Sequence, residues 1–358
     1  MQRLSAFQKT LQGAALITSP KHCYYLSRFL FEDGYLLLFP DAAYLLTDFR
    51  YEEAARALAD PAFLVVSPDT GALSGVVDLM RKHHADTLLV EEDHVTVAFQ
   101  EKLRVTFAKN YKDVTIEGGA SKTLTHMRQF KDAEELAITK RAQAITDAAF
   151  THILNFITPT RTEREVALEL EIFMRKMGAD GVAFPTIAVS GTASALPHGT
   201  PRDVPLQQGF LTMDYGAALD GYCADMTRTV VIGKADEEMQ RLYNTVLAAQ
   251  EAALAAAKIG MPHKTLDGIA RTLIEDAGYV GCFGHSLGHG VGLDIHEAPR
   301  LSRYAKEDAL LSVGEIVTVE PGIYVQGKHG CRIEDMIAVC DDGVHNLTKS
   351  EKTLIELC

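Results

Sequence analysis

The stretch that decides the fold reads Phe210-Leu-Thr-Met-Asp-Tyr-Gly-Ala-Ala-Leu-Asp-Gly-Tyr-Cys-Ala-Asp-Met-Thr-Arg-Thr229. Apolar and β-branched residues flank Asp220-Gly221, which is typical of a two-residue hairpin turn. Asp214 and Asp225 lie about equally far from this turn. In a hairpin such residues are opposite or diagonally opposite, with Cβ atoms roughly 5 to 8 Å apart. Because like charges at that distance destabilise a sheet, the pair favours a metal between them; two unrelated surface acids are the alternative.

A second hairpin repeats the arrangement. Residues 316–325 and 331–339 flank a Gly-rich turn, and Glu320 and Glu334 are nearly symmetric about it. Between the hairpins lies Gly284-His-Ser-Leu-Gly-His-Gly-Val-Gly-Leu-Asp-Ile-His-Glu297. Four carboxylates and one imidazole would form an oxygen-rich site whose four negative charges match two divalent cations. Such a site suits manganese, and its histidine is also compatible with cobalt, iron or zinc.

Length and composition indicate a globular protein with a sizeable core. At 358 residues two domains are expected. The net charge of −13 disfavours nucleic acid or an anionic membrane as partner. No run approaches the ~20 apolar residues of a membrane span, and no signal-peptide pattern is present, so we expect a cytoplasmic protein. The cysteines show no CxxC spacing, which favours reduced thiols; they are Cys23, Cys223, Cys282, Cys331, Cys340 and Cys358.

The element pattern changes near residue 125. Before it, short apolar runs alternate with amphipathic stretches, which predicts a separate α/β domain at residues 1–125 without a cluster of potential ligands. Strands are expected at 14–18, 34–39, 43–47, 63–66 and 87–90, and helices at 51–58, 73–83 and 97–107.

Residues 126–358 contain an internal repeat. Each half reads as two helices, a histidine-containing loop and a carboxylate hairpin. Helices are expected at 131–155, from the capping box of Thr162 and Glu165 to Gly178, at 237–258 and at 262–277. The repeat predicts two halves related by a pseudo-twofold axis, with the metals between them.

These motifs resemble those of the pita-bread metallopeptidases, and within them the Xaa-Pro aminopeptidases and the prolidases (Xaa-Pro dipeptidases). The matching pieces occur in the family's order: Pro197-His-Gly199, Met213-Asp-Tyr-Gly216, residues 221–229, residues 285–297, Val319-Glu-Pro-Gly-Ile-Tyr324 and Arg332-Ile-Glu-Asp335. The N-terminal part, including Thr47-Asp-Phe-Arg-Tyr51, is similar to a creatinase-type N-terminal domain. The resemblance spans essentially the whole chain. It implies an α/β (α+β) protein, with a creatinase-like domain at 1–125 before a pita-bread catalytic domain at 126–358.

The resemblance implies five metal ligands, which are Asp214, Asp225, His289, Glu320 and Glu334. Asp225 and Glu334 would bridge two ions. Asp214 would bind one ion, and His289 and Glu320 the other. Glu320 would also accept a proton from the attacking water. Ala224 replaces a common Ser and Cys331 a frequent Val, but neither change removes a ligand.

The resemblance also implies roles beside the metals. His198 and His296 would flank the reacting peptide, where an imidazole can donate to the oxyanion or bring a proton to the leaving proline nitrogen. His285 would form a wall of the proline pocket. Tyr324 and Arg332 would add further pocket groups, with Arg332 pairing with carboxylates. Structural histidines and a structural ion pair of Arg332 are the alternatives. The spacing of His285 and His289 lacks the Glu of an HExxH zinc helix.

The resemblance therefore implies a peptidase with two divalent cations, manganese being favoured, that hydrolyses the Xaa-Pro bond at the N-terminus of peptides. The alternative is an Xaa-Pro dipeptidase, which would need a group that captures the carboxylate beyond proline. A methionine aminopeptidase would not need the N-terminal domain. The intact ligands disfavour a non-catalytic binding protein and a metal-free creatinase-like hydrolase. A homodimer is expected by similarity.

Overall fold

The computed structural model describes residues 2–111 and 113–357. The chain divides into two compact units, Met1–Met127 and Arg128–Cys358. Among the described residues, no helix has the length and apolar character that crossing a membrane requires. Five cysteines are free thiols, and Cys358 lies outside the described residues.

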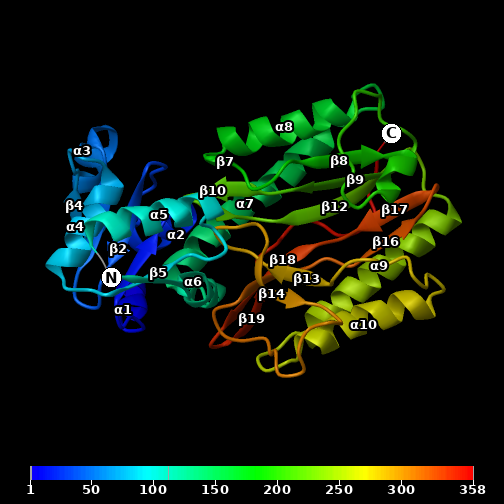
Figure 1. Cartoon of the computed structure of the whole chain (residues 1–358). Helices are drawn as coiled ribbons and strands as arrows, with labels where there is room; N and C mark the ends of the chain where they lie inside the picture. The colour runs from blue at the N-terminus through cyan, green and yellow to red at the C-terminus, as the bar shows by residue number, and fades with distance from the viewer. Residues whose placement is uncertain (1, 112, 358) are drawn as a thin grey trace. The chain divides into compact units, whose positions relative to one another are not determined.

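The first unit is built on a mixed six-stranded sheet with the order β4-β3-β2-β1-β5-β6 (Figure 1). Its strands are β1 (Ala14–Ile17), β2 (Gly34–Leu38), β3 (Ala43–Thr47), β4 (Leu64–Val66), β5 (Thr87–Val90) and β6 (Thr115–Gly118). Its helices are α1 (Gln2–Gln8), α2 (Pro20–Ser27), α3 (Phe49–Leu58), α4 (Ala72–Lys82), α5 (Val97–Asn110) and α6 (Ala120–Gln129). The central strands β1 and β3 are buried along their whole length, because helices supply apolar side chains to the core of this unit.

The predicted strands and helices of this unit are present, and four further elements were not predicted. Helices α1 and α2 have only seven and eight residues, too short for a clear helical period. Strand β6 carries a single large apolar residue, Ile116. Helix α6 has polar residues at most positions, so its sequence resembles a linker.

The second unit contains four long helices, α7 (Ala133–Phe156), α8 (Glu163–Lys176), α9 (Glu237–Ala256) and α10 (His263–Asp276). They match the four predicted helices closely. The capping box of Thr162 and Glu165 is present, with both reciprocal hydrogen bonds. Gly178 and Gly278 follow α8 and α10 with φ of 100° and 93°, the left-handed conformation that ends helices.

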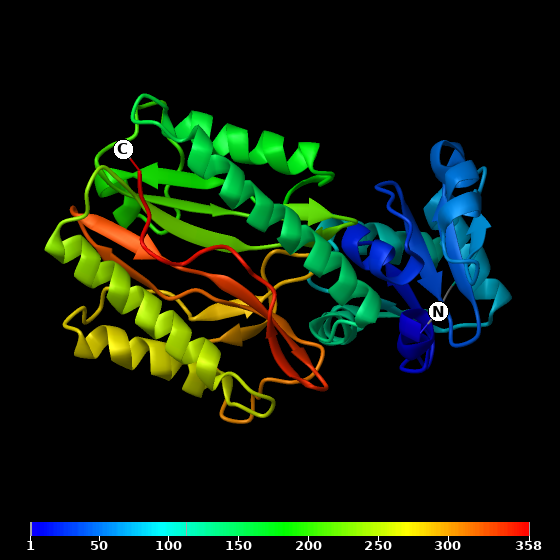
Figure 2. The ribbon, with the colours of Figure 1, turned by 180° about the vertical axis from the view of Figure 1, so that it is seen from behind.

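Two larger sheets lie between these helices. Their orders are β20-β12-β9-β8 and β14-β13-β15-β18-β19, and two smaller sheets pair β11-β10-β7 and β16-β17. The strands are β7 (Gly181–Val182), β8 (Ile187–Ser190), β9 (Gly209–Tyr215), β10 (Ala217–Leu219), β11 (Tyr222–Cys223), β12 (Met226–Ile232), β13 (Gly288–Gly290), β14 (Glu297–Leu301), β15 (Ile316–Val319), β16 (Gly322–Val325), β17 (His329–Arg332), β18 (Asp335–Cys340), β19 (Gly343–Asn346) and β20 (Glu356–Leu357), with a 3-10 turn at Gly191–Ala195. Figures 1 and 2 show α7 and α8 on one side of the strands and α9 and α10 on the other.

The two halves of this unit repeat the same element order around separate cores. One core joins α7 and α8 to β9 and β12, and the other joins α9 and α10 to β15 and β18. The expected turn of the first hairpin is present, with φ of 47° at Asp220 and 79° at Gly221, as a type I′ turn requires. The fold is therefore the predicted mixed α/β architecture with an internal repeat.

Candidate metal centre and active site

The predicted metal ligands meet in one cavity of about 540 Å³ within the second unit. Ligand atoms of Asp225, His289 and Glu334 lie within 4.8 Å of one another, and all three residues are buried. His289 Nε2 lies 3.6 Å from Asp225 Oδ2 and 3.4 Å from Glu320 Oε1. Asp214 lines the same cavity. Residues from two hairpins and the strand between them thus converge at one point.

The acids lie where the two hairpins interrupt their pairing. Asp225 lies between β11 and β12, Glu320 between β15 and β16, and Glu334 between β17 and β18. Asp214, near the end of β9, pairs with Thr227, so Asp225 two residues earlier is diagonal to it. The register is the same on both sides of each gap, so Asp225 is diagonal to Asp214 and Glu334 is opposite Glu320, and each pair faces one side of its hairpin.

Gly216 makes the break in the first hairpin sterically possible. A Cβ at this position would lie 1.7 Å from the carbonyl oxygen of Ala224, far inside van der Waals contact. Only glycine allows this close backbone approach immediately before Asp225.

Neighbouring groups orient the ligands. Thr227 Oγ1 donates to Glu334 Oε2 at 2.7 Å, and Arg332 Nη2 donates to Asp214 Oδ2 at 2.6 Å. His289 Nδ1 lies 3.1 Å from the carbonyl oxygen of Gly290, so it carries the proton and leaves Nε2 free to bind a cation. Asp214 Oδ1 is buried with no hydrogen-bond partner among the described residues. An orphaned carboxylate oxygen beside three more acids fits a divalent cation.

The pKa shifts of the buried carboxyl groups also indicate that the cluster lacks positive charge. Burial, reinforced by the neighbouring acids, raises the pKa of Asp225 and Glu334 well above the ordinary range. Burial raises the pKa of Glu320 to about 8 and lowers the pKa of His289 to about 4. Bound cations would reverse these penalties, because they supply the charge that buried carboxylates lack. The donor set therefore fits two divalent metal ions.

Histidines surround this cluster. His198, His285 and His296 line the cavity, and the His296 ring centre lies 4.4 Å from that of His289. His198 and His296 are exposed to solvent, and the partial desolvation of the His296 ring by the cavity wall lowers its pKa. A neutral imidazole that faces a cavity can donate or accept a proton.

His285 has a different environment. Its Nε2 lies 3.0 Å from the Tyr324 hydroxyl, and Nδ1 lies 2.9 Å from the carbonyl oxygen of Ser286. Burial lowers its pKa to about 3, so it stays neutral. Arg332 Nη1 donates to the same Tyr324 hydroxyl at 2.7 Å. Arg332 and His285 line the cavity, whereas Tyr324, predicted as a pocket group, is not a lining residue and contacts these two side chains instead.

Several lining residues were not predicted. Arg300, in β14, is an exposed cation that lines the cavity. Thr186 is buried, and its hydroxyl has no partner among the described residues. The apolar part of the lining comes from Phe184, Pro185, Ile187 and Ile295. No spacing signal separates these residues from ordinary strand and loop residues; only the fold brings them to the cavity.

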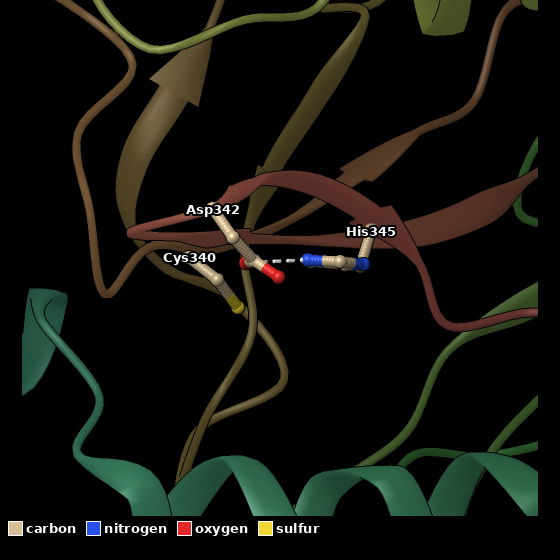
Figure 3. Close-up of side chains that lie close together, drawn as sticks. All are labelled: Cys340, Asp342 and His345. Carbon is tan, nitrogen blue, oxygen red and sulfur yellow. Dashed lines mark hydrogen bonds and ion pairs between the residues drawn. The ribbon is translucent and has the colours of Figure 1, made fainter.

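A second group of potential ligands lies on the β18–β19 hairpin (Figure 3). Its members are Cys340, Asp342 and His345, and His345 Nε2 lies 2.8 Å from Asp342 Oδ1. The side chains of Asp342 and His345 are 75% and 47% exposed, and the charge of Lys140 also acts on Asp342. Because water and these partners already satisfy the group, the buried cluster is the better candidate for the metals.

Comparison with known families agrees with this geometry. Residues 137–341 match the model of metallopeptidase family M24, and residues 3–128 match the Creatinase/Prolidase N-terminal domain. The chain belongs to metallopeptidase family M24. It is therefore a hydrolase of a family that uses divalent metals, and the predicted pita-bread fold with a creatinase-type N-terminal domain is confirmed.

Relatives within family M24 match almost the whole chain. An Xaa-Pro dipeptidase of Pyrococcus horikoshii is 37% identical over 347 residues, covering 96% of this chain and 94% of the relative. The structure of an Xaa-Pro dipeptidase from Bacillus anthracis superposes with a TM-score of 0.92 at 38% identity, covering 99% of this chain and 98% of that one. The structure of an X-Pro aminopeptidase from Thermotoga maritima superposes with a TM-score of 0.91 at 35% identity, covering 98% of this chain and 100% of that one.

Proposed function

We propose that this M24 hydrolase cleaves the Xaa-Pro bond at the N-terminus of peptides, as an Xaa-Pro aminopeptidase with two divalent metal ions. The observation that carries the proposal is the convergence of four carboxylates and His289 in a cavity that His198 and His296 also line. Relatives of both the aminopeptidase and the dipeptidase type support the Xaa-Pro substrate class. The second unit would be the catalytic domain and the first an N-terminal domain.

The five ligands would divide between the two ions. Asp214, Asp225, His289, Glu320 and Glu334 would hold them. When bound, two divalent cations supply the positive charge that polarises a peptide carbonyl and makes a water molecule more acidic. We propose manganese as the native metal, because the donor set is mostly carboxylate.

The chain's own groups would then handle protons and substrate. Glu320 accepts the proton of the attacking water. His198 and His296 donate to the carbonyl oxygen as it gains charge and bring a proton to the proline nitrogen, which leaves poorly without one. His285, held neutral between Tyr324 and the backbone, forms an uncharged wall for the proline ring.

The alternative is an Xaa-Pro dipeptidase, and Arg300 is the observation that favours it. Its exposed guanidinium lines the same cavity as His296, where it can bind the free carboxylate of a dipeptide. In an aminopeptidase that carboxylate is replaced by the continuing chain.

Substrate length tests both forms of the proposal. Manganese-loaded enzyme is offered Ala-Pro, Ala-Pro-Ala and longer Xaa-Pro peptides, and the products are separated by chromatography. Cleavage of all of them supports the aminopeptidase, and cleavage of Ala-Pro alone supports the dipeptidase. In the latter case Arg300→Met should raise KM for Ala-Pro at least about tenfold, as loss of a charge-assisted pair would. If no Xaa-Pro peptide is cut, the proposal is wrong.

A homodimer is also proposed by similarity, and a cytoplasmic location is proposed from the sequence pattern. Sedimentation of the purified protein and fractionation of the source cells test them.

A further inference from the structure

We propose that a buried ion cluster formed by Arg128, Lys131 and Glu297 positions His296 for catalysis. The proposal rests on the proposed function, because His296 needs a fixed position only if its imidazole takes part in that reaction. The three residues are positioning residues, since none of them lines the cavity.

The cluster directly follows His296 in the chain. Lys131 Nζ lies 2.6 Å from Glu297 Oε1, and Arg128 Nη2 lies 2.5 Å from Glu297 Oε2. Arg128 Nη2 also lies 2.6 Å from Asp294 Oδ2, on the other side of His296. Arg128 thus contacts the loop on both sides of the imidazole, and Lys131 adds a second contact at Glu297.

The side chains of the cluster are shielded from solvent, which fixes their geometry. The side chains of Arg128 and Glu297 are each 9% exposed, and that of Lys131 is 1% exposed. Ion pairs in such surroundings hold their geometry far better than surface pairs, because water cannot replace either partner without penalty.

The cations are themselves held in place. The backbone N–H of Lys131 donates to the carbonyl oxygen of Gly314 at 2.7 Å, and Gln129 Nε2 donates to Glu315 Oε1 at 2.6 Å. Gly314 and Glu315 lead directly into β15, which ends beside Glu320. The segment that carries the cations is therefore tied to a strand that also carries a metal ligand.

The loop is shaped around the Glu297 carboxylate. A Cβ on Gly292 would lie 2.0 Å from Glu297 Oε1, so the backbone packs directly against this oxygen. The carbonyl oxygen of Gly292 also accepts from the backbone N–H of Cys223 at 2.8 Å, two residues before Asp225. The Val291 N–H donates to the carbonyl oxygen of Ile316 at 3.0 Å, so the loop is fixed to both hairpins of the site.

His296 depends on this backbone for its position. Within the described part of the chain its imidazole forms no hydrogen bond, and its close ring contact is with His289. A side chain without such a bond moves with its backbone, and a shift of about 1 Å at a reacting group can reduce the rate by about 100-fold. The cluster provides the restraint that the imidazole itself lacks.

The test compares Lys131→Met, Glu297→Gln and the conservative Lys131→Arg in the metal-loaded enzyme. We expect the first two to lower kcat for an Xaa-Pro peptide about 10- to 100-fold. KM should change less than about threefold and the bound metal should stay constant, because none of these residues is a predicted ligand. Lys131→Arg should restore most of kcat. Ile153→Val, a buried substitution in α7 away from the cavity, controls for lost stability.

A double-mutant cycle separates positioning from a general structural role. If Lys131 acts through His296, adding Lys131→Met to His296→Ala should lower kcat little beyond His296→Ala alone. If Lys131→Met does not fold, a triple variant replaces it in the test. This variant combines Arg128→Met, Lys131→Met and Glu297→Leu, which removes all three charges of the cluster and leaves no buried charge unpaired.

Two results would overturn the proposal. The first is a normal kcat in a folded, metal-loaded Lys131→Met or triple variant. The second is a double variant whose decrease in kcat equals the product of the decreases caused by Lys131→Met and by His296→Ala separately. Normal turnover of His296→Ala is a distinguishable failure. It would remove the role given to His296 in the proposed function, and the reason for positioning it as well.

Discussion

At the scale of single residues, Arg332 shows how much of the site depends on one side chain. Its guanidinium donates to Asp214, to Thr227 Oγ1 at 2.9 Å and to the Tyr324 hydroxyl, and it is 3% exposed. Sequence reasoning predicted that Arg332 pairs with carboxylates. It could not predict which ones, because the partner in β9 is more than a hundred residues away and only the folded hairpins bring the two together.

Arg332→Lys should weaken metal binding. Lysine keeps the charge but cannot form the fork that contacts Asp214, Thr227 and Tyr324 together. Loss of an outer hydrogen-bonding partner typically costs 10- to 100-fold in metal affinity, so we expect a change of about that size in a calorimetric manganese titration. An unchanged affinity would show that Arg332 is only a structural ion pair.

Glu320→Gln tests the proton acceptor. The amide cannot take up a proton and is a poorer metal ligand, so metal affinity should fall and most turnover should be lost. The assay is run at manganese concentrations that fill both sites, checked by metal analysis. Near-normal turnover at full occupancy would refute this role for Glu320.

At the scale of elements, the second helix of each half holds a histidine loop through a buried carboxylate and an arginine. In α8, Glu163 accepts from the backbone N–H of Ser190 at 2.7 Å and from Arg202 Nε at 2.8 Å, on either side of His198. In α10, Asp267 pairs with Arg271, which donates to the carbonyl oxygen of His285 at 2.9 Å. The repeat thus extends to how its loops are fixed.

The helices and hairpins of this unit could be predicted because their signals are local. The capping box of Thr162 and Glu165 and the Asp220-Gly221 turn each lie within a few residues. The gap between β15 and β16 has a local signal in Pro321-Gly322, whereas the gap between β17 and β18 has none, because Cys331–Val339 reads as an uninterrupted strand. In the gap between β17 and β18, the Glu334 N–H donates instead to the carbonyl oxygen of Thr227 in the other hairpin, at 3.1 Å.

Glu163 predicts an acid-sensitive contribution to stability. Its burial would raise the pKa, but Arg202 and backbone N–H donors outweigh burial and hold the pKa below the ordinary range. A depressed folded-state pKa stabilises the protein above the unfolded pKa, and this stability is lost as pH falls through the folded pKa. Glu163→Gln should therefore lower the free energy of unfolding by about 2 kcal/mol at pH 7 and by less in acid.

Urea denaturation of Glu163→Gln and the unmodified protein between pH 7 and pH 3 measures this difference. If the difference in free energy of unfolding between the two proteins stays constant from pH 7 to pH 3, the charge of Glu163 does not stabilise the fold.

At the scale of the whole molecule, the proposed metal ligands come from both halves of the repeat. Asp214 and Asp225 belong to the first hairpin, while Glu320 and Glu334 belong to the second. The apolar core of the second half includes Phe210 and Val231 from the strands of the first half, so the two halves already pack together and the cations would reinforce that contact. The sequence could predict this convergence, because the acids recur at matching places in the repeat. The shape of the cavity and the positions of Arg300 and Thr186 within it required the fold.

Metal loading should stabilise the protein. A ligand that binds only the folded state raises the free energy of unfolding by about 2.7 kcal/mol when its free concentration is 100 times its dissociation constant. For a unit of this size, that increase corresponds to a rise in Tm of roughly 5 to 10 °C. Scanning calorimetry with and without manganese measures the shift, and a chelator should reverse it. Equal Tm values in both samples would mean that the cluster does not hold the metal in the folded state.

The central claim is that five side chains hold two divalent cations on which hydrolysis depends. Its most direct test is to remove metal stepwise with a chelator and to measure metal content per chain and cleavage of Ala-Pro-Ala in the same samples. We predict two bound ions per chain at full activity, loss of cleavage as they are removed, and recovery when manganese is returned. Full cleavage by a chain that holds no metal would contradict the account.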